Sequence, residues 1–146
     1  LLFNVLAYMS DRLLTGGNTV AVLDELYLWL SNPVAIEYIR NCLKRVRKRD
    51  SALVMASQNL EDFDQEGVRE MTKPLFAIPP HQFLFNPGSI GKRFYMDMLQ
   101  LDEAEFELIQ RARRGECLYK CGMERYHLVV KAPTHKAALF GSAGGR

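Results

Sequence analysis

Two short apolar runs, separated by a long amphipathic stretch, constrain the fold of this 146-residue chain more than any other feature. The first run covers residues 19–23 (Thr-Val-Ala-Val-Leu) and the second covers residues 51–57. Between them, Asn32 and Pro33 are typical of a helix start, and apolar residues then recur at helical spacing. A strand, a helix and a second strand in this order form a βαβ unit, in which the two strands run parallel. The sequence therefore predicts an α/β domain.

Polar side chains follow both predicted strands. Asp24 and Glu25 come directly after the first strand, and Gln58 follows the second. Because the carboxyl ends of parallel strands meet at one edge of a sheet, we expect the three side chains to lie at a common edge. In nucleotide hydrolases the first acid of such a pair holds the magnesium shell and the second positions or deprotonates the attacking water. The alternative is structural: the acids cap the next helix, and Gln58 satisfies a loop backbone.

The rest of the chain predicts flanking helices and a C-terminal β-hairpin. Asp102 and Glu105 have the spacing of a capping box, and Gly122 lies between two strand-like runs. Pro74 indicates a kink or an end in a preceding helix. The expected helices cover residues 1–14, 33–48, 61–78, 90–99, 103–112 and 134–140, the further strands cover 82–85, 116–120 and 125–131, and residues 141–146 form a flexible tail.

Composition excludes several classes of protein. The net charge of +2 gives no overall field for nucleic acid or membrane, and no apolar run approaches the ~20 residues of a membrane helix. Three cysteines fit no disulfide framework and indicate a reducing compartment. Cys117, Cys121 and His127 could be three metal ligands, but structural zinc needs four and usually closer cysteine pairs. The start at Leu1, inside a predicted helix, suggests a fragment of a longer protein.

Four local sequences together resemble one family. They are residues 22–30 (Val-Leu-Asp-Glu-Leu-Tyr-Leu-Trp-Leu), a basic helix ending in Arg-Lys-Arg at 47–49, a strand ending in Ser-Gln at 57–58, and Arg-Gly-Glu-Cys-Leu at 114–118. In this order they resemble the traffic ATPases of conjugative transfer and type IV secretion, which belong to the RecA-like HerA/FtsK group of P-loop NTPases. The resemblance covers roughly residues 1 to 140.

The resemblance implies a RecA-like partial domain with a mainly parallel sheet. It also implies ATP and Mg²⁺ as cofactors, with Asp24 in the magnesium shell, Glu25 activating water and Gln58 as the sensor of the γ-phosphate. The implied assembly is a hexamer that works with proteins of the secretion or conjugation apparatus. It would be cytoplasmic, at the inner face of the membrane.

The phosphate-binding loop of P-loop enzymes is absent from this sequence. The glycine pair before the acids, Gly16 and Gly17, is followed by Asn18 rather than lysine. We therefore expect residues 1–146 to be the C-terminal portion of an ATPase domain, and the isolated polypeptide to be unable to hydrolyse ATP.

Basic residues are dense at the end of the second predicted helix. Arg45, Arg47 and Arg49 there, and Arg114 after a later helix, are candidates for an arginine that reaches a neighbouring subunit's nucleotide or for contacts with DNA phosphates. The alternative is a solvated surface that also complements the helix dipole. Two rival functions remain open: a DNA-translocating motor of the same superfamily, and a non-catalytic interaction module that docks through its basic helix.

Overall fold

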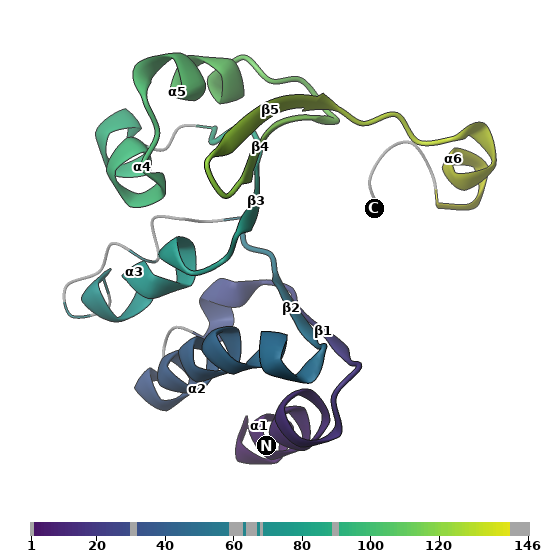
Figure 1. Cartoon of the computed structure of the whole chain (residues 1–146). Helices are drawn as coiled ribbons and strands as arrows, with labels where there is room; N and C mark the ends of the chain where they lie inside the picture. Colours follow the sequence, from purple (N-terminus) through teal and green to yellow (C-terminus); the bar gives the residue numbers. More distant parts are fainter. Residues whose placement is uncertain are drawn as a thin grey trace. The chain divides into compact units, whose positions relative to one another are not determined.

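The computed structural model describes residues 2–29, 32–58, 63, 67, 69–88 and 91–140 of the chain (Figure 1). The chain divides into two compact units, residues 1–80 with 90–100 and residues 81–89 with 101–146. In chain order the elements are α1 (Leu2–Ser10), the π-helical turn η1 (Asp11–Gly16), β1 (Val20–Leu23), the 3₁₀ turn η2 (Leu26–Trp29), α2 (Pro33–Arg45), the 3₁₀ turn η3 (Val46–Arg49), β2 (Ala52–Met55), α3 (Arg69–Ala77), β3 (His81–Leu84), α4 (Lys92–Leu99), α5 (Glu103–Gln110), β4 (Glu116–Cys121), β5 (Glu124–Val129) and α6 (Thr134–Phe140).

The first unit is built on the predicted βαβ arrangement. β1 and β2 pair in parallel, with Val20 opposite Ala52 and Leu23 opposite Met55. The connecting helix α2 starts as predicted: the Asn32 side chain accepts hydrogen bonds from the backbone N–H groups of the first turn, and proline takes the first position. α2 lies against one side of the strand pair (Figure 1).

The core of the first unit lies between this strand pair and the helices. One stripe of α2 is fully buried, including Ile36, Ile39 and Cys42. It packs with Leu13, Leu23, Leu26, Phe63, Leu75 and Met98, which come from elements far apart in the sequence. Each of these side chains loses apolar contact with water, which is the main favourable contribution to folding.

The second unit holds an antiparallel sheet with the strand order β3-β4-β5. The hairpin of β4 and β5 turns at Gly122 and Met123, as predicted. α5 contacts β4 and contributes Phe106 and Ile109 to a buried cluster with Leu84 and Leu118. These contacts form between segments that are close in sequence, apart from β3.

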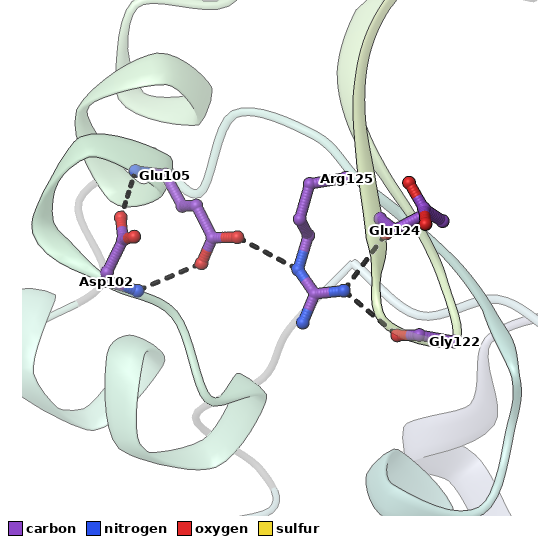
Figure 2. Close-up of polar contacts among 5 residues, drawn as sticks. All are labelled: Asp102, Glu105, Gly122, Glu124 and Arg125. Atoms are coloured by element: carbon purple, nitrogen blue, oxygen red, sulfur yellow. Dashed lines mark hydrogen bonds and ion pairs between the residues drawn. The ribbon is translucent and has the colours of Figure 1, made fainter.

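A polar network joins the start of α5 to the hairpin turn (Figure 2). The Asp102 carboxylate accepts from the Glu105 N–H at 2.8 Å, and the Glu105 carboxylate accepts from the Asp102 N–H at 2.9 Å, so the predicted capping box is formed. The other oxygen of Glu105 accepts from Arg125 Nε at 2.9 Å. Arg125 Nη1 then donates to the carbonyls of Gly122 and Glu124, which fixes the turn to the helix.

The predicted fold class is confirmed, with an α/β arrangement, a parallel strand pair, flanking helices and a C-terminal hairpin. Two details differ from expectation. The third strand, His81–Leu84, pairs antiparallel with β4 because the hairpin offers it a free edge with matching apolar residues. Pro74 lies inside α3, which continues to Ala77. Most of the predicted helix before residue 69 and the predicted tail at 141–146 lie outside the described residues.

Candidate functional site at the carboxyl edge of the parallel strands

The two parallel strands are extended past their ends by backbone hydrogen bonds. The Ala56 N–H donates to the Leu23 carbonyl at 2.9 Å, and the Leu26 N–H donates to the Ala56 carbonyl at 2.9 Å. Leu23 and Leu26 are both buried in the core of the first unit. The segment between them, Asp24 and Glu25, is therefore held at both ends at the carboxyl edge of the sheet.

Glu25 and Gln58 meet at this edge. Gln58 Nε2 donates a hydrogen bond to Glu25 Oε1 over 2.7 Å, across 33 residues of sequence. The predicted common edge for these residues is therefore present. The bond leaves the second carboxylate oxygen of Glu25 and the amide oxygen of Gln58 to face a ligand.

The backbone at Glu25 has an unusual conformation. Its φ of 50° lies in the left-handed region, which costs about 1–2 kcal/mol for a residue other than glycine. Asp24 stabilises this turn, because its Oδ1 accepts the Glu25 N–H at 2.9 Å. Strain of this kind persists where the surrounding structure holds it, and it is often found at functional sites.

The edge is open to solvent. Asp24 and Gln58 are exposed and Glu25 is half-buried, so no salt-bridged interior seals the carboxylates. Beside them the Ser57 hydroxyl is buried and has no hydrogen-bond partner among the described residues. A buried hydroxyl without a partner is uncommon in proteins, and it provides a further polar group next to Gln58.

The donor set at this edge fits a magnesium ion that is shared with a nucleotide. Mg²⁺ in such sites takes one or two protein carboxylates, several waters and phosphate oxygens. Asp24 offers an exposed carboxylate of that kind. Across the described residues no three His, Cys, Asp or Glu side chains form a metal cluster. Cys117, Cys121 and His127 thus do not gather into a zinc site there.

The cysteines are free thiols with structural surroundings. Cys42 and Cys117 are buried, and burial is the main reason why the pKa of each thiol is raised. A raised pKa keeps the thiol protonated and makes it a poor nucleophile or metal ligand. Neither thiol therefore has the surroundings of a reactive group.

The basic candidates lie away from the acids. Arg45, Arg47 and Arg49 are exposed and directly precede β2, whereas the acids follow the carboxyl end of β1. A four-residue strand separates the two ends by roughly 13 Å. Arg114 belongs to the other compact unit. Within the first unit, the fold thus brings Glu25 and Gln58 together but leaves the basic segment at the opposite edge.

Sequence reasoning missed a row of aromatic side chains on the second unit's sheet. Phe83 stacks on Tyr119 at 4.6 Å between ring centroids, and Tyr126 stacks on Tyr119 at 6.0 Å. His81 makes a 2.7 Å hydrogen bond with the Tyr119 hydroxyl. The signal was the alternation of His81 and Phe83 opposite Tyr119, but the antiparallel register was needed to read it.

Comparison with known proteins places these features in a family. A parallel α/β unit with an acid pair and an amide at its carboxyl edge fits part of a RecA-like domain. No protein-family model matches the chain. Two curated relatives match over 97% of it: a probable conjugal transfer protein TrbE of Sinorhizobium fredii at 31% identity, and the conjugal transfer protein TrbE of Rhizobium radiobacter at 30%.

Two further proteins extend the same picture. The type IV secretion system protein CagE of Helicobacter pylori is 28% identical over 72% of the chain and 10% of its own length. The structure of VirB4 of Thermoanaerobacter pseudethanolicus matches 92% of the chain and 37% of the VirB4 chain, with a TM-score of 0.82 and 31% identity. The chain is therefore a homologue of the TrbE, VirB4 and CagE proteins of conjugal transfer and type IV secretion, as the sequence motifs predicted.

The chain spans about a fifth of the length of the curated TrbE relatives, 22% of one and 18% of the other. In the described ranges, no helix combines the length and the apolar character needed to cross a bilayer.

Proposed function

We propose that this chain is the C-terminal portion of a P-loop ATPase domain and works in an ATP-hydrolysing motor for conjugation or type IV secretion. The homology to TrbE and VirB4 proteins supports the process in which it acts. The observation that carries the catalytic proposal is the 2.7 Å contact between Glu25 and Gln58 at the carboxyl edge of two parallel strands. Catalytic groups of open α/β sheets gather at this edge.

Three side chains have proposed roles. Mg²⁺, when bound with ATP, would neutralise charge on the phosphates, with Asp24 in its shell. Glu25 would orient the attacking water and accept its proton. Gln58, already bonded to Glu25, would sense the γ-phosphate through its amide, which can both donate and accept.

The first phosphate contacts would come from another part of a longer polypeptide. Gly17 is not available as a phosphate cradle, because its backbone packs against Arg49: a Cβ at this position would lie 2.8 Å from the Arg49 carbonyl oxygen. The glycine pair therefore has a packing role in this unit. We accordingly propose that the isolated chain does not hydrolyse ATP, and that the whole protein is a cytoplasmic hexamer at the inner face of the membrane.

The decisive experiment uses a longer polypeptide. This chain replaces the matched part of Rhizobium radiobacter TrbE, and Mg²⁺-dependent ATP turnover and ATP binding are measured. Glu25→Gln should lower turnover by about 10²–10⁴-fold while ATP still binds, because it removes the general base. Glu37→Gln, the same change on the exposed side of α2, is the matched control and should leave turnover unchanged. Full turnover in the Glu25→Gln chimera would refute the site assignment.

A second candidate function is DNA translocation by a motor of the same superfamily. The favouring observation is that Arg45, Arg47 and Arg49 are exposed, with no ion pair among the described residues. Binding of DNA through them should weaken steeply with salt. Each neutralised phosphate contact should lower the slope of log affinity against log salt by about 1. Unchanged salt dependence after neutralising all three would exclude this segment as the DNA contact.

A further inference from the structure

The strand pair of the first unit is apolar on both faces. β1 reads Val-Ala-Val-Leu and β2 reads Ala-Leu-Val-Met, with no polar residue on either face. Strands whose outer face meets water usually alternate apolar and polar residues, whereas parallel strands covered on both sides are apolar throughout. The sequence of both strands is therefore that of a sheet covered on two sides.

The structure covers only one of these faces. Ala21, Leu23, Leu53 and Met55 pack against the helical core. On the opposite side, Val20 and Val22 of β1 are 66% and 64% exposed, and Val54 of β2 is 47% exposed. The register sets Val22 directly beside Val54, so the three valines form one continuous apolar surface, which we call the open face.

A groove extends the open face toward α1. It has a volume of about 700 Å³ and is lined by Val20 and Val22 together with Val5, Tyr8 and Trp29. The exposed ring of Tyr8 and the side chain of Val5 add further apolar surface to its wall. Arg12 is the charged residue of the lining, and its guanidinium lies over the Tyr8 ring at 5.4 Å.

We propose that the open face is covered by the apolar side of a helix from another part of the same, longer polypeptide. The inference rests on the proposed function in one respect, that the chain is a portion of a larger domain. A helix fits because parallel strands are joined by crossovers that place helices on both faces of a sheet. The remaining four-fifths of the TrbE relatives provides the length from which it would come. An apolar lining with one cation excludes nucleic acid as the occupant.

The experiment compares labelling of one engineered cysteine in two settings. Val22→Cys is made in a Cys121→Ser background, in the isolated chain and in the TrbE chimera. Maleimide labelling at position 22 is followed by peptide mass spectrometry. Labelling in the chimera should be on the order of tenfold slower, because a covered site reacts only on local opening. Met123→Cys at the hairpin turn, where the side chain is 92% exposed, is the control and should react equally in both settings.

Two results would overturn the proposal. The first is equal labelling of position 22 in the chimera and in the isolated chain. The second is protection in the isolated chain that grows with its concentration, which would make a second copy the occupant. Native Cys42, which is fully buried, reports folding, because it reacts only where the unit has opened. ATP turnover is a separate readout, so protection without turnover would keep this inference and reject the catalytic proposal.

If Cys42 reacts in the chimera, the same question is asked with two separate polypeptides. The isolated chain is co-expressed with the rest of TrbE, and co-purification is measured. Val22→Asp should abolish co-purification, while Val129→Asp, an equally exposed valine on β5, should leave it intact. Absence of co-purification with the unsubstituted chain would overturn the proposal.

Discussion

The two compact units contain strands of opposite kinds, and they are held together differently. In the first unit, parallel strands of four residues each depend on a crossover helix and on core residues distant in sequence. In the second, six-residue antiparallel strands meet at a tight turn, and an ion pair fixes that turn to the neighbouring helix. The candidate catalytic residues lie on the first unit. Parallel strands bring two chain ends to one edge, whereas a hairpin places successive ends at opposite edges.

The largest expected effect separates the long-range core from the surface of the same helix. Ile39→Ala removes a fully buried side chain of α2 and should lower the free energy of unfolding by about 2–5 kcal/mol. Denaturant unfolding followed by the fluorescence of Trp29, the single tryptophan and a residue of this unit, measures it. Val34→Ala, at an exposed site on α2, should stay within about 0.5 kcal/mol. Equal losses would show that the buried stripe does not stabilise the parallel unit.

A glycine at the start of the hairpin tests how far the second unit depends on local backbone geometry. Gly115 has a φ of 84°, and a Cβ there would lie 2.7 Å from the Val130 carbonyl oxygen. Gly115→Ala should cost about 2 kcal/mol or more, since the left-handed backbone alone costs about 1–2 kcal/mol. Gly122→Ala has a similar φ but open space around it, and should cost less. Thermal unfolding of both variants gives the difference, and equal losses would contradict a role for the clash.

The network in Figure 2 should contribute less than the core but more than a surface ion pair. Glu105→Ala removes both the capping-box bond to Asp102 and the bond to Arg125, and should cost about 1–3 kcal/mol. Glu107→Ala removes an exposed i,i+4 pair with Arg111 on the same helix and should cost at most about 0.5 kcal/mol. Hydrogen exchange at the turn amides should rise only in the Glu105 variant.

The smallest expected effect concerns the start of α2. Asn32→Ala removes the side-chain acceptor for the Val34 N–H at 2.9 Å and should cost about 1 kcal/mol. Asn32→Gly should cost only a few tenths of a kcal/mol, because glycine is tolerated at this position. Denaturant midpoints of the two variants provide the measurement. An alanine variant as stable as the glycine variant would mean that the cap does not stabilise the crossover helix.

Local patterns predicted much of the fold. The apolar runs, the Asn-Pro helix start, the Asp102–Glu105 spacing and the Gly122 turn each depend on a few neighbouring residues, and each forms as expected. The partner of β3 was not predictable in the same way. Its strand-like pattern predicts a strand but not which free edge it joins, since edge pairing depends on where distant segments lie.

The sequence by itself determined that Asp24, Glu25 and Gln58 follow two strands of one parallel pair, because strand direction and the crossover rule fix which ends share an edge. Only the tertiary structure decided that Gln58 bonds Glu25 directly, that Glu25 takes a left-handed backbone, and that one face of the strand pair is left open. The physical reason is that hydrogen bonds and burial depend on the path of each loop and on contacts between residues far apart in the chain. No local pattern encodes those distances.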